Sequence, residues 1–132
     1  TGPVITSGTL DSATTTSDGT SAYSIGYRNI PQNSQNSNYT LAATDMGKHI
    51  YSQNSGAQTI TIPTNASVPF ALGTAVTIVN NGTTAITISA AGVSLYQAGT
   101  TNAGNRTLGV RGLVTIVKVA TNIWFISGSG IS

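Results

Sequence analysis

The chain has 132 residues, of which only 6% are charged, with a formal net charge of +2 and no cysteine. This length predicts one domain with its own core, and the lack of cysteine excludes disulfides and thiolate metal sites. The basic residues are scattered, whereas nucleic-acid binding requires a cluster of them. No apolar run approaches the roughly 18 residues of a membrane span. We therefore expect neither nucleic-acid binding nor membrane insertion.

The N-terminal segment, residues 1–24, differs in composition from the rest of the chain. From Thr6 to Ser24 it consists mostly of Ser, Thr, Gly and Asp. This composition predicts a linker or extended arm. It is either a flexible solvated tail or a strand that orders only against a neighbouring subunit. Because the chain begins with Thr1 and not with Met, we expect a processed chain or a piece of a longer protein.

Residues 25–132 are expected to form an all-β module. Ser, Thr, Asn and Gln dominate the polar positions, and these residues compete with helix formation through local hydrogen bonds. The segment 58–62 alternates polar and apolar residues and stops at Pro63, as a strand does. One short helical turn is expected near residues 44–47, capped by Thr44 or Asp45. The predicted fold is a compact antiparallel β-sandwich or barrel preceded by an extended N-terminal arm.

A hairpin is predicted for residues 75–89. Alternation places Val76 and Ile78 on one face, and the same parity holds for Ile86 and Ile88. A three-residue loop over residues 80–82 would pair Val76 with Ile86 and keep all four side chains on one side. Gly82 would then occupy the left-handed position of a type I turn with a bulge.

A second hairpin is expected from two strongly apolar segments, residues 113–119 and 123–126, joined by a turn at Thr121 and Asn122. Both faces of these strands are largely apolar, whereas a half-exposed sheet alternates more cleanly. Either this pair lies centrally in a sandwich, or one of its faces is buried against another subunit. No fixed period links the predicted β segments, so no internal repeat is expected.

Catalytic groups are scarce. The chain has three acids, Asp11, Asp18 and Asp45, and a single histidine, His49. Paired carboxylates need two acids close together, and the first two lie in the predicted arm. A Ser-His-Asp arrangement through His49 and Asp45 lacks the Gly-x-Ser-x-Gly turn that marks a nucleophile. We expect no enzyme activity, no cofactor and no metal site within one chain.

Saccharide binding is the chemistry that this composition permits. The predicted loop between residues 96 and 106 supplies an aromatic ring, amides and a guanidinium, from Tyr96, Asn102, Asn105 and Arg106. Loops carry function more often than strands do. These four residues are therefore the candidate ligand-binding residues. In the alternative interpretation, Tyr96 packs inward and Arg106 braces the carbonyls of the loop.

Several blocks together resemble a module of tailed-phage and prophage structural proteins, found near the C-terminus of fibre-like or appendage proteins. The resemblance covers about residues 25–132. Its opening block, residues 25–32 (Ile-Gly-Tyr-Arg-Asn-Ile-Pro-Gln), is its most specific part. The other blocks are Tyr39–Leu41, Asp45–Ile50, Thr59–Pro63, Gly104–Leu108 and Trp124–Gly130. The resemblance implies a virion component, which we expect to be a trimer. It also implies a structural role for Arg28, and it assigns no receptor-binding residues.

The function expected from these observations is structural and adhesive. The chain would be a tail-fibre, appendage or capsid-fibre module, located in the virion and involved in host attachment. Its expected partners are further copies of itself, other virion proteins and glycans of the host surface, bound through many weak contacts. One alternative is a monomeric carbohydrate-binding module or lectin with an exposed aromatic platform, for which Trp124 and Tyr96 are the candidates. A glycan-degrading enzyme that uses Asp45 is the other.

Overall fold

The computed structural model describes residues 15–17, 19–20, 22–24 and 29–132. Near the N-terminus, β1 (Thr15–Ser17) and β2 (Ala22–Ser24) pair antiparallel as a two-stranded sheet of their own. Residues 1–14, 18 and 21 of the predicted arm lie outside the described residues. So do Gly26, Tyr27 and Arg28 of the opening block, and the structural role expected of Arg28 stays a prediction.

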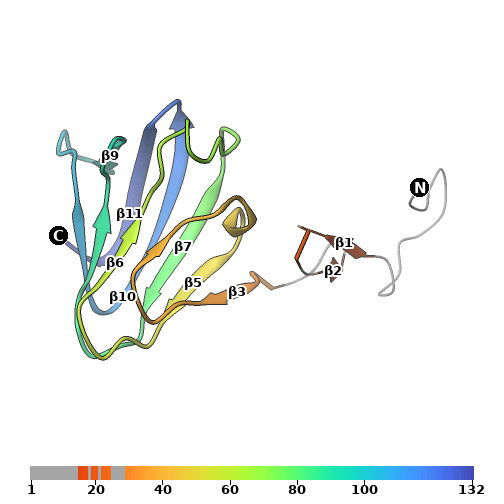
Figure 1. The fold of residues 1–132 in the computed structure, drawn as a ribbon. Helices are drawn as coiled ribbons and strands as arrows, with labels where there is room; N and C mark the ends of the chain where they lie inside the picture. The colour runs from red at the N-terminus through yellow and green to blue at the C-terminus, as the bar shows by residue number, and fades with distance from the viewer. Residues whose placement is uncertain (1–14, 18, 21, 25–28) are drawn as a thin grey trace.

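All other strands belong to one nine-stranded mixed sheet that curls into a half-barrel (Figure 1). These strands are β3 (Gln32–Ser34), β4 (Tyr39–Thr40), β5 (His49–Ser52), β6 (Gln58–Thr61), β7 (Ala75–Asn80), β8 (Ile86–Ser89), β9 (Ser94–Gln97), β10 (Arg106–Ala120) and β11 (Ile123–Ile131). A single 3-10 turn, η1 (Ala43–Asp45), is the one helical element of the described part of the chain. The predicted all-β class is confirmed.

The sheet has two halves, which we call limbs, and successive strands from β3 to β8 lie alternately in the first and in the second. The strands β3, β5 and β7 lie side by side and parallel in the first limb. The strands β4, β6 and β8 lie parallel in the second limb. Each successive pair, β3–β4, β5–β6 and β7–β8, therefore forms one rung of a flattened solenoid. The expectation of an antiparallel sheet is wrong, because β3 with β5, β5 with β7, β4 with β6, β6 with β8 and β9 with β11 are all parallel.

The strand β10 joins the two limbs. Its first residues pair antiparallel with β8, the strand bends over residues 109–112, and its later residues pair antiparallel with β7. The strand β11 returns along the other side of β10, and β9 adds to β11. The predicted hairpin over residues 113–126 is confirmed, with Asn122 at a positive φ of 56° in its turn. Its Oδ1 atom accepts a 2.7 Å hydrogen bond from the backbone N–H of Asn65.

For residues 75–89, the prediction of which side chains are buried is confirmed, and the prediction that the two strands pair as a hairpin is wrong. The four side chains Val76, Ile78, Ile86 and Ile88 are all buried, as the parity argument requires. However, β7 and β8 do not pair with each other, since each pairs with β10 and with the rung below. The segment between them stacks on the preceding rung, where the N–H of Asn81 donates to the carbonyl of Ser52.

The stacking of the second and third rungs reveals a repeat that the sequence reading did not find. His49 pairs with Thr77 in the first limb, and Gln58 pairs with Ile86 in the second. The separation in sequence is the same for both pairs, so residues 49–62 and 77–90 are equivalent in space. The first rung is shorter, because Gln32 is much nearer in sequence to its partner His49. A period that changes between rungs is hidden from a search for one fixed spacing.

The core lies between the limbs. Its buried side chains come from both limbs and from β9, β10 and β11 and include Leu41, Ile50, Ile60, Ile62, Phe70, Leu95, Leu108, Val114, Ile116, Trp124 and Ile126. Trp124 packs edge-on against Phe70 with ring centroids 5.6 Å apart. Lys118 is buried beside them, and its Nζ donates to Oδ1 of Asn65 at 2.6 Å and to the carbonyl of Phe70 at 2.7 Å.

Buried polar side chains hold the rungs together at the corner between the limbs. The amide Nδ2 of Asn80 donates to the carbonyl oxygens of Thr84 and Leu108, at 2.9 and 3.1 Å. In the rung below, Ser52 Oγ donates to Oε1 of Gln58. These bonds satisfy backbone and side-chain groups that a purely apolar corner would leave unpaired.

Candidate interaction surfaces

The outer face of the first limb carries an apolar surface. Its strands β7 and β10 alternate between side chains buried in the core and side chains on the outside. The outward set consists of Val79, Leu113, Val117, Val119, Phe125 and Tyr96, which we call the apolar face. Leu113 is 50%, Val119 48% and Phe125 41% exposed. Exposed apolar groups clustered in this way mark interaction surfaces more often than scattered ones do.

The register places these side chains in rows across the strands. Leu113 lies opposite Val79, which lies opposite Tyr51. Two rows further along, Val117 lies opposite Phe125, which lies opposite Tyr96. The rings of Tyr96 and Phe125 are 5.7 Å apart and tilted by 42°. The apolar face therefore consists of two apolar rows, which are separated by the row of Thr77, Thr115 and Ser127.

Three hydroxyl groups within this face are already hydrogen-bonded inside the chain, while Ser127 and Ser129 of β11 are exposed beside Thr115 and Leu113. Thr77 and Thr115 lie opposite each other, and their hydroxyl oxygens are 2.9 Å apart. The phenol oxygen of Tyr51 accepts a 2.7 Å bond from Nδ2 of Asn81. A surface whose hydroxyls are internally paired loses little when water is removed from it. Such a surface suits contact with another apolar surface better than contact with a sugar.

His49 is paired in the same way. Its Nδ1 lies 3.1 Å from the carbonyl oxygen of Ile30, and its Nε2 lies 3.1 Å from Nε2 of Gln32. Because a carbonyl only accepts, Nδ1 carries the hydrogen, and the neutral ring then accepts at Nε2 from the amide. Both ring nitrogens are thus satisfied in the neutral form.

A shallow depression of about 330 Å³ lies at the edge of the apolar face. It is lined by Ile30, His49, Thr77, Val79 and Leu113. The lining offers apolar groups and two polar side chains that are already engaged, so it provides little free hydrogen-bonding capacity. The depression extends the apolar face towards β3 and has none of the convergent polar groups typical of a small-molecule site.

The outer face of the second limb has the opposite chemistry. It carries a grid of hydroxyls, Thr40, Thr59, Thr61, Thr87, Ser89 and Thr107, which we call the hydroxyl face. Thr59, Thr87 and Thr107 lie in one row, and Thr61 lies between Thr40 and Ser89 in the next. Within the part of the chain that the structure describes, these hydroxyls make no side-chain hydrogen bonds. They remain available to water or to a polar ligand.

The structure does not bring the four predicted sugar-binding residues into one cluster. Tyr96 and Gln97 are neighbours in β9, so their side chains point to opposite faces, and Arg106 Nη1 lies 3.5 Å from Oε1 of Gln97. Tyr96 thus lies on the apolar face, away from Arg106. The Nε atom of Arg106 is buried without a partner. Because the side chains of the four residues do not point towards one another, the case for the loop as a single binding site is weaker.

The two asparagines of that loop have different roles. Asn105 is engaged structurally, since its Oδ1 accepts a 2.8 Å bond from the backbone N–H of Ala90. Asn102 is exposed, and its backbone N–H donates to Oγ1 of Thr100 at 3.1 Å while its carbonyl accepts from the N–H of Gln97. The loop is therefore folded on itself, and Asn102 is the member that presents its side chain to solvent.

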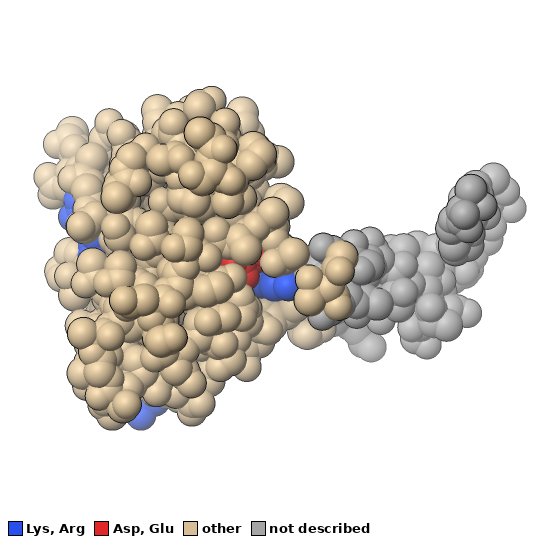
Figure 2. Space-filling view, in the orientation of Figure 1, with Lys and Arg blue, Asp and Glu red and all other residues tan. Residues whose placement is uncertain are grey.

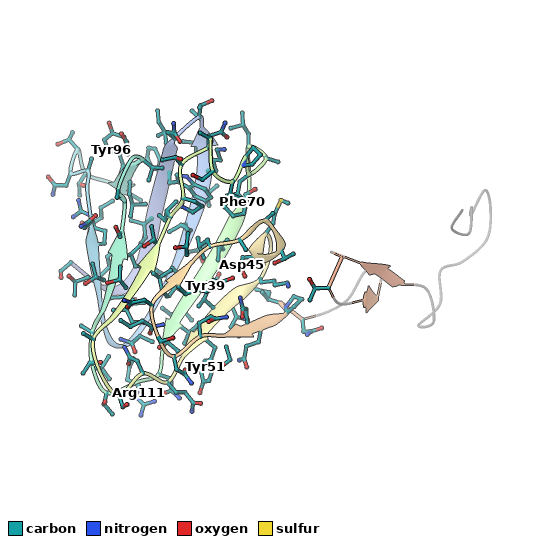
Figure 3. All side chains as sticks on the ribbon, viewed as in Figure 1. Tyr39, Asp45, Tyr51, Phe70, Tyr96 and Arg111 are labelled. Atoms are coloured by element: carbon teal, nitrogen blue, oxygen red, sulfur yellow. The ribbon has the colours of Figure 1, made fainter. Side chains whose placement is uncertain are left out.

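Asp45 is completely buried and serves the fold. Its Oδ1 accepts from Nδ2 of Asn33 at 2.7 Å, and its Oδ2 accepts from Tyr39 Oη at 2.6 Å and from the N–H of Ala42 at 2.7 Å. Figure 3 shows Tyr39 and Asp45 lying together beside η1. Burial, together with the bond to Asp45, raises the pKa of Tyr39 to about 12. The predicted short turn is present at Ala43–Asp45, but the predicted cap is wrong: Ala42 is the N-cap, and Asp45 ends the turn and accepts from the N–H of Ala42.

Asp45 and His49 do not form a catalytic relay. The partners of Asp45 are Asn33, Tyr39 and Ala42, whereas those of His49 are Ile30 and Gln32. Among the described residues, no three His, Cys, Asp or Glu side chains gather as metal ligands. Asp11 and Asp18, the other acids, lie outside the described residues. Figure 2 shows few charged side chains on the visible face of the β domain.

Comparison with known proteins gives no family for this chain, since no protein-family model and no curated protein matches its sequence. Among the described residues, none of the helical structure is long or apolar enough to cross a membrane. The function of the chain must therefore be inferred from its apolar face and its hydroxyl face.

The sequence reading missed the hydroxyl face, although a signal was present. The segments Thr59-Ile60-Thr61 and Thr87-Ile88-Ser89 alternate hydroxyl and buried isoleucine in the same way. Only the parallel pairing of β6 with β8 turns these two short alternations into one surface. The apolar face was foreseen in part, as the possibility that one face of the 113–126 hairpin is covered by another subunit.

Proposed function

We propose that this chain is a structural and adhesive module of a bacteriophage virion, which presents a rigid β scaffold to the host surface. The observation that carries the proposal is the division of its surface into an apolar face on one limb and an uncharged hydroxyl face on the other. The first suits assembly with other virion subunits, and the second suits weak polar contacts with surface glycans. The resemblance of residues 25–132 to phage appendage modules supports the same role.

The low charge of the chain fits this role. A surface covered by Ser, Thr and Asn depends little on ionic strength, because salt screens interactions between charges. Adhesion through hydroxyls would be weak for one copy, and several copies on one particle would multiply it through effective concentration. The proposed module is not an enzyme, and its buried Asp45 has a structural role.

Binding of the purified chain to surface glycans of bacteria tests the adhesive role. The probes are lipopolysaccharide and capsular polysaccharide preparations on a biosensor, with the chain coupled to a multivalent scaffold. We expect binding by the multivalent form that falls when Thr59, Thr87 and Thr107 are changed together to alanine. Absence of binding to every preparation in the multivalent form, or binding unchanged by the triple variant, contradicts adhesion through the hydroxyl face.

A monomeric carbohydrate-binding module is the second candidate, favoured by the half-buried Tyr96 beside the exposed Phe125. Aromatic rings exposed beside each other can stack on a sugar ring. Trp124, the other candidate for such a platform, is 1% exposed and packs in the core, so it cannot serve. In the same biosensor experiment, tight binding by the uncoupled chain that is lost in Tyr96→Ala, and kept in the triple threonine variant, favours this second candidate.

A further inference from the structure

We infer that Asn81 is a site of spontaneous deamidation, and that the corner between the limbs suppresses this reaction while the chain is folded. The sequence contains a single Asn-Gly pair, Asn81-Gly82. Asparagine is a thermolabile residue, and its deamidation is fastest before glycine, because glycine has no Cβ to hinder the attacking backbone nitrogen. The inference goes beyond the proposed function and does not depend on it.

The reaction needs only groups of the chain and water. The backbone nitrogen of Gly82 loses its proton and forms a bond to Cγ of Asn81. The bond from Cγ to Nδ2 breaks, and Nδ2 leaves with that proton as ammonia. Water then adds to the cyclic imide. Opening at Cγ gives aspartate, whereas opening at the backbone carbonyl carbon of residue 81 gives isoaspartate, in which the main chain is one carbon longer.

Both reacting groups are engaged in the folded chain. Gly82 is buried, and its N–H donates to Oδ1 of Asn80 at 3.0 Å. The leaving group, Nδ2 of Asn81, donates to the phenol oxygen of Tyr51 at 2.7 Å. A base from solvent reaches a buried, hydrogen-bonded N–H only when the structure opens locally. The fold therefore protects the nucleophile and also holds the amide that it must attack.

The backbone on both sides of the pair is fixed to the rung below. The N–H of Asn81 donates to the carbonyl of Ser52 at 2.8 Å, and the N–H of Thr83 donates to the carbonyl of Asn54 at 2.9 Å. Ring closure requires the backbone to rotate until the nitrogen of Gly82 meets Cγ, and these bonds oppose the rotation. The rate in the folded chain is therefore the rate in the open chain multiplied by the population of the open state.

The corner accommodates the two products differently. Aspartate keeps the length of the main chain, and its carboxylate can accept a hydrogen bond from the hydroxyl of Tyr51 where the amide donated one. Isoaspartate adds a backbone carbon next to Gly82, where a Cβ atom would already overlap Asn54. Extra volume at a closely packed position is destabilising. Isoaspartate formed during a local opening therefore prevents the corner from closing again in its native form.

The test is the rate of deamidation at Asn81, measured by proteolysis and mass spectrometry after incubation in mildly alkaline buffer. We expect the folded chain to react at least about tenfold more slowly than the same chain unfolded in urea. Tyr51→Phe, which removes the acceptor of Nδ2, should react severalfold faster than the native chain when folded and at the same rate in urea. Tyr96→Phe, at the other end of the β domain (Figure 3), should leave both rates unchanged.

Equal rates in the folded and the unfolded native chain overturn the inference, and this comparison decides the matter even should Tyr51→Phe fail to fold. A folded Tyr51→Phe variant that reacts at the native rate overturns the role of the phenol in protection. A second measurement concerns the products. Aged chains that carry isoaspartate should unfold at a lower urea concentration than the variant Asn81→Asp, and equal midpoints would contradict the account of the corner.

Discussion

Gly82 lies directly against Asn54, its counterpart in the rung below. A Cβ atom on Gly82 would overlap Oδ1 of Asn54 as well as its backbone N and O. The N–H of Thr83 donates to the carbonyl of Asn54 at 2.9 Å, so the two turns are held in contact. Gly82 is thus required for close approach between rungs, and its φ is not in the left-handed region that the predicted hairpin assigns to it.

The first prediction follows from this contact. Gly82→Ala should lower the free energy of unfolding by about 1–3 kcal/mol, the cost of overpacking a well-packed site. Urea denaturation measures the change. Gly56→Ala is the matched control, because Gly56 lies in the same corner of the second rung with open space around it. Equal losses for the two variants would mean that the contact with Asn54 is not the cause.

The second prediction concerns the buried carboxylate. Asp45→Asn should lower stability by about 1–3 kcal/mol, because an amide cannot accept from all three donors and adds two N–H groups facing them. Tyr39→Phe, which removes one donor and leaves the carboxylate with two, should cost less, about 1 kcal/mol. Thermal or urea unfolding of both variants at neutral pH gives the comparison. A larger loss for Tyr39→Phe than for Asp45→Asn would contradict this order.

The third prediction is a pH dependence at the alkaline end. The pKa of Tyr39 is raised from 10.0 to about 12, so the folded state holds this proton more tightly than the unfolded state. The stability from Tyr39 is therefore fully present below about pH 10 and is lost as the pH rises through 12. Absorbance titration should show one tyrosine ionising near pH 12. In Tyr39→Phe this ionisation should be missing and the stability should fall less between pH 10 and 12.

The fourth prediction concerns strain in the bend of β10. Arg111 has a φ of 67°, a left-handed conformation that is unfavourable for a residue with a Cβ. Arg111→Gly removes this strain and should raise the free energy of unfolding by up to about 1 kcal/mol, after the larger unfolded-state entropy of glycine is included. Arg111→Ala keeps the strain and serves as the control. A gain in the alanine variant equal to that in the glycine variant would assign the effect to the charge instead.

What the sequence could predict was determined by local alternation. The burial of Val76, Ile78, Ile86 and Ile88, the 113–126 hairpin and a short helical turn at Asp45 all follow from neighbouring residues, and all are observed. The pairing of β7 and β8 was wrong because alternation gives the face of a strand and does not give its neighbour. Here each of these strands finds its partners in the preceding rung and in β10, and no local pattern shows this.

The candidate site was harder to predict than the fold. The loop over residues 96–106 has a composition suited to sugars, but the direction of each side chain depends on strand parity and on tertiary partners. Tyr96 points to the apolar face, and Asn105 is used to hold the N–H of Ala90. The hydroxyl face needs three strands from distant parts of the sequence. The parallel pairing of β6 with β8 and the antiparallel pairing of β8 with β10 bring Thr59, Thr87 and Thr107 into one row.

The bend in β10 has a consequence for the order in which the protein folds. Because β10 pairs with β8 before the bend and with β7 after it, neither limb is complete until this strand arrives. The contacts it makes are distant in sequence, as between Thr77 and Thr115. Closing such long loops precedes any gain from pairing, and folds of this kind form slowly. We therefore expect the C-terminal strands to complete the fold, since without β10 the strands β7 and β8 lack the partner that joins the two limbs.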